Sequence, residues 1–315
     1  MDRADILASL IDAARQRGLE IGPLDRPMVT RDMGPVEYVD RASRDDLLAA
    51  YEGHEVDARR IPQIDHVWGE QSLLECVGGG RDYDYVLASH VIEHVPDLFG
   101  WLGEIAAVLA DGGLAVFFAP DKRYTFDARR PVSASGEFVD AYVRRLRRPD
   151  VRQIFNHIYE TRDLQAPPLD EAALTERARQ GLERGREAQA AGAYLDTHCW
   201  VFTPRSLVDA LDLASRLDLL PFEIVRVEQG ADEFLIALRR LSRDLAPEAR
   251  RAAFSASVAR LALAADDAPD GDVAVLQAQA RAALARAAAI EGSATWRLTA
   301  PLRAILGRLK GGQLR

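Results

Sequence analysis

The sequence predicts an α/β fold built on a doubly wound, mostly parallel sheet. Short apolar runs of strand length alternate with segments of helical periodicity up to about residue 125, and this alternation resumes after residue 203. The clearest unit is residues 83–120, which predicts a strand, a polar turn, a helix and a second strand. Two strands joined by a covering helix form a parallel crossover. Ligands are therefore expected just beyond the carboxyl ends of these strands.

In this central unit, residues 85–89 form an apolar run without helical period, as expected of a buried strand. Pro96 and Asp97 then favour the start of a helix, whose apolar positions from 98 to 109 fall on one face. Residues 111–113, Asp-Gly-Gly, are expected to stop that helix. A second apolar run, residues 114–119, predicts the next strand.

The first eighty residues predict a similar alternation. An apolar stripe indicates a helix over residues 4–15, and a very short strand with a turn follows at residues 19–23. Residues 36–40 predict a second strand that ends in an acid. Ser43 is expected to cap a helix over residues 43–51, and residues 64–68 indicate a third strand.

The rest of the chain divides into an insertion, a resumed α/β segment and an extension. We expect a helical insertion over residues 126–200, with helices near 135–146 and 170–190, and then a helix over 203–217. Residues 222–228 and 233–238 predict a closing antiparallel pair at one sheet edge. The first domain is therefore placed at residues 1–241, and residues 242–315 are expected to form an alanine-rich helical extension.

The composition is that of a globular protein and excludes some classes. Hydrophobic residues make up 48% of the 315 residues, and the formal net charge of −9 argues against a nucleic-acid coat protein. Cys76 and Cys199 are far apart, so both are expected to be packing residues. The amino terminus lacks the pattern of a signal peptide, and no stretch is apolar enough to span a bilayer. We expect a cytoplasmic protein without a nucleic-acid partner.

The end of the chain is basic and amphipathic. After Glu291 it carries five basic residues and no acid, interleaved with apolar residues. This pattern favours peripheral contact with a membrane surface or a protein partner. Packing of the tail on its own domain is the alternative, and the sequence leaves the oligomeric state open.

The order of these motifs resembles class I S-adenosylmethionine-dependent methyltransferases. The resemblance covers residues 1–240 and is carried by L-E-I-G-P at 19–23, by Asp40, by Y-D-Y-V-L-A-S-H-V-I-E-H-V-P-D at 83–97 and by D-G-G-L-A-V-F-F-A-P-D at 111–121. It is similar in particular to a bacterial subgroup that begins E-I-G-P and often accompanies cell-surface polysaccharide synthesis. The resemblance implies a Rossmann-like fold and S-adenosylmethionine as the cofactor.

The resemblance also implies which residues bind the cofactor. Gly22 would let the backbone approach closely, and Asp40 would accept the ribose hydroxyls, as an acid does in dinucleotide sites. The full set of expected cofactor residues is Glu20, Gly22, Pro23, Asp40, Glu70, Gln71, Ser89 and His90. The family has two further glycines at alternate positions, where this chain has Leu24 and Arg26.

Three histidines are candidates for the catalytic base. Methyl transfer is an in-line displacement that gains most from a close, aligned acceptor, and a hydroxyl acceptor also gains from a base near neutral pH. The candidates, in order of preference, are His198, His90 and His157.

Residues 90–94 also spell H-x-x-E-H, a zinc metallopeptidase pattern. That chemistry needs both histidines on one helix, whereas His90 ends a predicted strand and Pro96 follows too soon. We therefore expect no peptidase and no metal ligand here. His94 is interpreted either as a buried structural residue or as a base.

The insertion is locally basic, and two interpretations of its charge stay open. Its arginines are either a solvated helix face or a clamp for an anionic acceptor such as a nucleotide-diphosphate sugar or a lipid-linked glycan. They are Arg129, Arg130, Arg144, Arg145, Arg147, Arg148 and Arg152.

Taken with the resemblance, the sequence predicts O-methylation of a sugar or a polysaccharide-related acceptor, which is a small molecule or a glycan. The alternative is a methyltransferase-like binding module that has lost catalysis, which the two missing glycines favour. A dehydrogenase is a poorer fit, because the G-x-G-x-x-G pattern is absent after the first strand.

Overall fold

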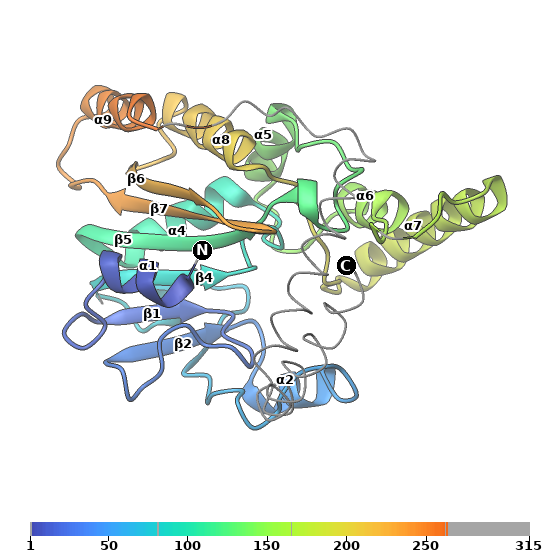
Figure 1. Ribbon diagram of the computed structural model, residues 1–315, viewed down its shortest axis with the longest axis horizontal. Coiled ribbons are helices and arrows are strands. Elements are labelled where there is room, and N and C mark those ends of the chain that lie inside the picture. Colours follow the sequence, from blue (N-terminus) through green and yellow to red (C-terminus); the bar gives the residue numbers. More distant parts are fainter. Residues whose placement is uncertain (1, 81, 165, 262, 264–315) are drawn as a thin grey trace, which may run out of the picture. The chain divides into compact units, whose positions relative to one another are not determined.

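A computed structural model describes residues 2–80, 82–164, 166–261 and 263. Within this part of the chain, seven strands form one sheet in the order β3-β2-β1-β4-β5-β7-β6 (Figure 1). The strands are β1 (Gly18–Ile21), β2 (Val36–Asp40), β3 (His66–Val67), β4 (Tyr83–Ser89), β5 (Leu109–Pro120), β6 (Phe222–Gln229) and β7 (Glu233–Arg240). The helices are α1 (Arg3–Leu10), α2 (Arg44–Ala50), α3 (Leu73–Cys76), α4 (Leu98–Val108), α5 (Ser135–Arg144), α6 (Val151–Glu160), α7 (Glu171–Ala191), α8 (Pro204–Arg216) and α9 (Pro247–Ala259), with a 3-10 turn, η1 (Lys122–Tyr124).

The sheet is mostly parallel, as predicted. β1 pairs in parallel with β2 and β4, and the pairs β2–β3 and β4–β5 are parallel too. β7 runs antiparallel to both β5 and β6, which confirms the predicted closing pair. The carboxyl ends of β1, β2, β4 and β5 therefore meet at one edge of the sheet, where the sequence predicted ligand binding.

Helices cover both faces of the sheet, so the fold is doubly wound. Successive residues of β4 point to opposite faces, and Val86 belongs to a different apolar cluster from Leu87. The cluster with Val86 is closed by residues of α4 and α8, and the cluster with Leu87 by residues of α1 and α2. The predicted α/β architecture is thereby confirmed.

The capping residues predicted where helices begin, whereas the predicted stop signal of α4 did not predict where that helix ends. Asp97 caps α4 through its Oδ1, which accepts a hydrogen bond from Gly100 N at 2.9 Å. Ser43 caps α2 in a reciprocal capping box, as predicted. The predicted stop of α4 at residues 111–113 is wrong: the helix ends at Val108, and those residues belong to β5, where the pairing with β4 shifts register.

The insertion is helical, and one of its helices was not predicted. α5 and α7 match the expected helices, whereas α6 lies between them and packs along α7 (Figure 1). Two glycines of α7 make this close packing possible. A Cβ on Gly181 would lie 3.0 Å from Phe155 Cδ2, and one on Gly185 would lie 3.0 Å from Val151 Cγ1.

The described residues form one compact unit. α9 belongs to this unit although it lies beyond the predicted domain boundary at residue 241. Its Phe254 is fully buried, and Ser257 Oγ accepts a hydrogen bond from Ile224 N of β6 at 3.0 Å. The predicted basic tail after Glu291 lies outside the described residues. None of the helices in the described part of the chain has the length and apolar character that a membrane crossing needs.

Candidate functional site

A cavity of about 1080 Å³ lies where the carboxyl ends of β1, β2 and β4 meet. The loops after these strands form one side, and residues at the end of α5 together with Tyr194 and Asp196 form another. The cavity walls combine aromatic rings with charged groups. Its lining includes six of the eight predicted cofactor residues, namely Glu20, Gly22, Pro23, Asp40, Ser89 and His90.

The loop after β1 begins with Gly22 in a left-handed conformation, at φ +65°. Its N–H donates to Val39 O of β2 at 2.9 Å, and a Cβ here would lie 2.8 Å from Val91 Cγ2. Leu24 stands where the resembling family has its second glycine, and it too has a positive φ, at +40°. The backbone of the loop therefore keeps a conformation typical of glycine even where the glycine itself is replaced.

The side chain of Glu20, in β1, fixes this loop through hydrogen bonds to its backbone. Its carboxylate is buried and accepts hydrogen bonds from Met28 N at 2.7 Å and Val29 N at 3.1 Å. Burial raises the pKa of Glu20 to about 7, although the two backbone hydrogen bonds oppose that rise. Glu20 therefore fixes the loop that carries Gly22.

Asp40 ends β2 and lies in the cavity wall. Its Oδ1 accepts a hydrogen bond from Ala42 N at 3.3 Å, and burial raises the pKa of this carboxyl group. Beside it, the guanidinium of Arg41 stacks over the ring of Tyr194 at 4.6 Å from the ring centroid. An acid, a cation and an aromatic ring thus share one corner of the cavity.

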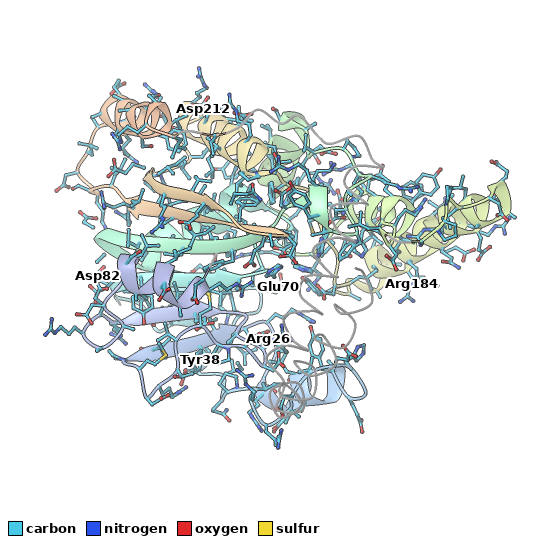
Figure 2. All side chains as sticks on the ribbon, viewed as in Figure 1. Arg26, Tyr38, Glu70, Asp82, Arg184 and Asp212 are labelled. Carbon is cyan, nitrogen blue, oxygen red and sulfur yellow. The ribbon has the colours of Figure 1, made fainter. Side chains whose placement is uncertain are left out.

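Glu70 and Gln71 do not line the cavity, whereas the two residues before them, Trp68 and Gly69, do. The carboxylate of Glu70, which is labelled in Figure 2, instead pairs with Arg148 at 2.5 Å. Gln71 turns back and donates its side-chain amide to Val67 O at 3.1 Å. The adenine contact predicted after the third strand therefore fits Trp68 and Gly69 better than the residues named from sequence.

His90 lies at the carboxyl end of β4, with both ring nitrogens facing carboxylates. Its Nε2 is 2.9 Å from Glu233 Oε2, and its Nδ1 is 3.5 Å from Glu93 Oε1. Burial alone would lower the pKa of His90, but these two carboxylates raise it to about 9. Ser89, next to it, accepts a hydrogen bond from Arg3 Nη1 at 3.2 Å.

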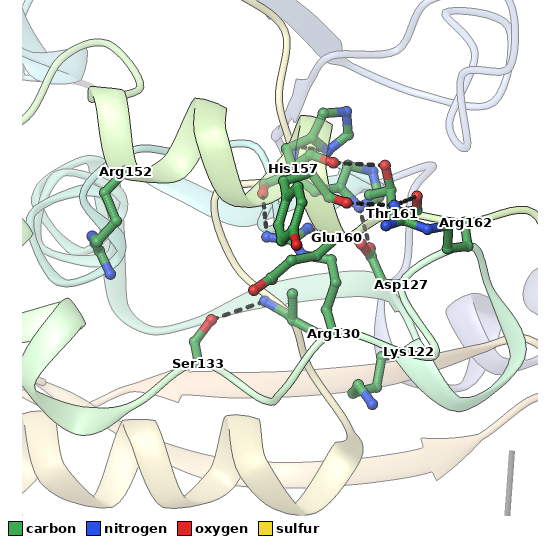
Figure 3. A network of polar contacts seen from close by, with 12 residues as sticks. Lys122, Asp127, Arg130, Ser133, Arg152, His157, Glu160, Thr161 and Arg162 are labelled. Atoms are coloured by element: carbon green, nitrogen blue, oxygen red, sulfur yellow. Dashed lines mark hydrogen bonds and ion pairs between the residues drawn. The ribbon is translucent and has the colours of Figure 1, made fainter. Parts of the chain in front are cut away.

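His198 and His157 lie behind the cavity wall rather than in it. His198 Nδ1 is 2.6 Å from Asp127 Oδ2, and Arg130 donates to both Asp127 Oδ1 and His198 O. Figure 3 shows Asp127 and Arg130 beside His157 and Glu160. His157 Nδ1 accepts a hydrogen bond from His198 N at 3.2 Å, and burial lowers the pKa of His157 to about 4.

His94 joins the cavity to this buried network. It lines the cavity, and its ring packs edge-on against the ring of His198 with centroids 4.6 Å apart. Its Nδ1 is 2.9 Å from Asp196 Oδ1. Asp196 and Asp127 were missed from the sequence, although Asp196 stands only two residues before His198.

Most arginines of the insertion pair with acids. Arg144, Arg147 and Arg152 pair with carboxylates of Asp150, Glu104 and Glu137 respectively. Arg130 is buried and belongs to the His198 network. Arg145 and Arg147 both line the cavity, but Arg147 is paired there with Glu104, which also lines it. The interpretation of these arginines as an anion clamp is therefore reduced to Arg145.

Residues 4–214, more than half of the chain, match a family model described as a methyltransferase domain. No curated protein matches the chain.

Solved structures with a related arrangement include the CurJ carbon methyltransferase, at 11% identity over 76% of this chain and 54% of that one, with a TM-score of 0.37. They also include an S-adenosylmethionine-dependent methyltransferase from Aquifex aeolicus, at 12% identity over 76% of this chain and 90% of that one, with a TM-score of 0.39. A third is the N-methyltransferase NodS from Bradyrhizobium japonicum WM9, at 13% identity over 76% of this chain and 94% of that one, with a TM-score of 0.34.

Proposed function

Because this chain belongs to the methyltransferase domain family and is a class I S-adenosylmethionine-dependent enzyme, we propose that it O-methylates a sugar or a polysaccharide-related acceptor. The E-I-G-P segment at residues 20–23 and the two-sided cavity support this proposal. The observation that carries it is that one cavity has the Gly22 and Asp40 loops on one side and the insertion on the other. Such a cavity offers separate walls to a methyl donor and to an acceptor.

The residues on the strand side fit the cofactor. A loop with positive φ at Gly22 and Leu24 provides a cradle that a side chain at Gly22 would fill, and Asp40 adds a half-buried carboxylate for hydroxyl groups. Gly22, Asp40 and Trp68 would hold the nucleoside part, while Glu20 keeps the loop in place. When bound, S-adenosylmethionine supplies an electrophilic methyl group on its sulfonium.

The insertion side fits a hydroxyl-rich, anionic acceptor. Tyr142, Tyr194 and Trp101 line the cavity with aromatic faces, on which sugar rings can pack. Arg145 adds positive charge for a phosphate group, and Asp97 and Asp196 add acceptors for hydroxyl groups. A nucleotide-linked sugar matches this combination.

Among the three predicted base candidates, the contacts favour His198. Both ring nitrogens of His90 face carboxylates, and His157 Nδ1 already accepts a hydrogen bond from the backbone. His198 is oriented through Nδ1 by Asp127, which leaves its Nε2 as the nitrogen that can act on an acceptor. The packing of its ring against His94 brings it next to the cavity wall.

An acceptor screen with radiolabelled methyl donor tests the proposal. We expect label in nucleotide sugars or lipid-linked glycans, and loss of labelling when the free hydroxyl groups of the acceptor are blocked. Replacing His198 by alanine should lower turnover about a hundredfold, with unchanged binding of S-adenosylhomocysteine. The exposed His54 provides a matched control, and its alanine variant should keep full turnover. Labelling confined to amines or carbon atoms would contradict O-methylation.

A further inference from the structure

Glu93 has an unusual environment for a carboxylate. It is 1% exposed, and neither of its side-chain oxygens has a hydrogen-bond partner among the described residues. The nearest basic atoms are His90 Nδ1 at 3.5 Å and His94 Nε2 at 3.8 Å from Oε1. Because a buried charge without strong partners is costly, this carboxylate calls for a further partner.

Two histidines join Glu93 to form a compact set of ligand atoms. One donor atom from each of Glu93, His94 and His198 lies within 4.8 Å of the others. Glu93 and His94 come from the turn after β4, whereas His198 comes from the segment before α8, about a hundred residues later in the chain. This set differs from the linear H-x-x-E-H motif, because no helix runs through residues 90–94 and His90 is held by Glu233.

Each histidine has a carboxylate beside its Nδ1, as metal-bound histidines commonly have. Asp196 Oδ1 lies 2.9 Å from His94 Nδ1, and Asp127 Oδ2 lies 2.6 Å from His198 Nδ1. Metal-bound histidines commonly give one ring N–H to a carboxylate and bind the ion through the other nitrogen. Here Asp196 and Asp127 lie beside Nδ1 of the two rings, which leaves both Nε2 atoms for a ligand.

From these contacts we propose that Glu93, His94 and His198 bind one divalent transition-metal ion, with zinc as the reference ion. Two imidazoles and one carboxylate are a ligand set that zinc uses when a fourth position stays open. Bonds of about 2.0–2.1 Å in tetrahedral geometry separate ligand atoms by about 3.4 Å. The 3.8 Å between Glu93 Oε1 and His94 Nε2 closes to that value with a small side-chain movement.

The fourth position is open to an oxygen ligand, because His94 and Asp196 line the cavity. A divalent ion there binds that oxygen and lowers the pKa of its proton. On the proposed function, this oxygen is that of the acceptor hydroxyl: its proton would pass to water in the cavity, and His198 would act as a ligand of the ion rather than as a free base. The existence of the metal site does not depend on the proposed function.

The test uses the full chain without an affinity tag, stripped with a chelator and then equilibrated with zinc. We expect one zinc per chain by elemental analysis, and visible absorption bands of a low-symmetry site when cobalt replaces zinc. All six histidines and both cysteines lie in the described part of the chain, so the alternative ligands are known. Wild-type protein that holds no zinc or cobalt above the buffer blank would overturn the proposal.

Variants locate the ion. Glu93→Gln and His94→Gln should each abolish stoichiometric zinc binding, and Asp127→Asn should weaken it about ten- to a hundredfold by freeing the His198 ring. The control is His54→Gln, at an exposed histidine outside the cluster, and it should bind zinc as wild type does. Thermal melts identify any variant that does not fold. If Glu93→Gln does not fold, His94→Gln becomes the decisive variant, because the side chain of His94 is 24% exposed and that of Glu93 only 1%. Unchanged zinc and cobalt binding in a folded His94→Gln protein would refute the site.

The two proposals fail in different ways. Methyl transfer by chelator-stripped enzyme at the full rate would overturn the role of the ion in activating the hydroxyl and leave the proposed O-methylation intact, whereas the metal site itself is tested by zinc and cobalt binding. Stoichiometric zinc lost in Glu93→Gln, together with no transfer to any hydroxyl acceptor, would support the site and overturn the proposed function.

Discussion

Asp40 combines burial with a position at the cavity wall. Its carboxyl group has a raised pKa because water is largely excluded from it, and its one contact to Ala42 N is long, at 3.3 Å. A carboxylate in such a place gains from every ligand hydroxyl that donates to it. It contributes little to the packing of the core, because it lies at the end of β2 rather than within it.

Replacing Asp40 by alanine should therefore weaken cofactor binding and spare the fold. A hydrogen bond to a charged group contributes about 1.5–3 kcal/mol, which corresponds to about a ten- to a hundredfold loss of affinity. Calorimetric titration with S-adenosylhomocysteine measures this loss, and a thermal melt checks the fold. Asp40→Asn is the matched control and should lose less affinity than Asp40→Ala. Equal affinity in wild type and Asp40→Ala would show that the ribose contact lies elsewhere.

Among single residues, the sequence predicted which residues at the strand ends reach the cavity, but it did not predict the contacts that come from the insertion. Gly22, Asp40 and Ser89 line the cavity because strand ends follow directly from apolar runs. Glu70 misses the cavity because β3 is only two residues long and the chain turns away after Gly69. The Asp127 and Asp196 contacts to histidines depend on the fold of the insertion, which local pattern does not determine.

Among the helices, α6 and α9 are stabilised by packing against other elements, which the local sequence pattern does not predict. α6 is a ten-residue amphipathic helix, and a helix of that length is marginal by itself. It is held by α7, whose Gly181 and Gly185 admit its side chains. α9 was expected as part of a separate extension, yet Phe254 places it in the main core. By contrast, β2 and α8 have clear strand and capping signals and were predicted almost to the residue.

Removing α9 should destabilise the methyltransferase domain. A chain that ends at residue 263 keeps Phe254 and the Ser257 bond to β6, and a chain that ends at residue 241 loses both. Losing a buried phenylalanine costs about 3–5 kcal/mol, so the shorter chain should melt about 10 °C or more below the longer one. Phe254→Ala in the full chain should reproduce most of that difference. Equal melting temperatures of the two shortened chains would mean that α9 adds nothing to the fold.

At the scale of the whole molecule, one ionic network spans four neighbouring segments of the sheet. Glu37 of β2 accepts hydrogen bonds from Arg17, which precedes β1, and from Tyr83 of β4, and it lies 2.6 Å from His66 Nε2 of β3. Burial alone would raise the pKa of Glu37, but the hydrogen bonds from His66, Arg17 and Tyr83 lower it to about 2. The folded chain therefore favours the ionised form of Glu37.

The lowered pKa of Glu37 means that the folded protein loses stability as the pH falls. A carboxyl group whose pKa falls on folding stabilises the protein above its unfolded pKa, and this stability is lost as pH falls towards the folded pKa. Here the window runs from 4.5 down to about 2. Glu37→Gln should lower the free energy of unfolding at pH 7 by on the order of 2 kcal/mol after a discount for solvent screening, and the difference from wild type should shrink at pH 3. Denaturant unfolding at both pH values measures it, with the exposed Glu52→Gln as control. A difference that stays constant between these pH values would contradict the role of Glu37.

The order of the strands also bears on self-association. An open sheet leaves unpaired backbone groups at its two edges, which invite pairing with another chain. One edge is β3, which offers only two residues, and the other is β6, with charged side chains at Glu223, Arg226 and Glu228. Pairing β6 with the same strand of a second copy would have to accommodate this row of charges. The short strand at one edge and the charged strand at the other therefore disfavour edge-to-edge aggregation. Any dimer of this enzyme is expected to form through its helices rather than by extending the sheet.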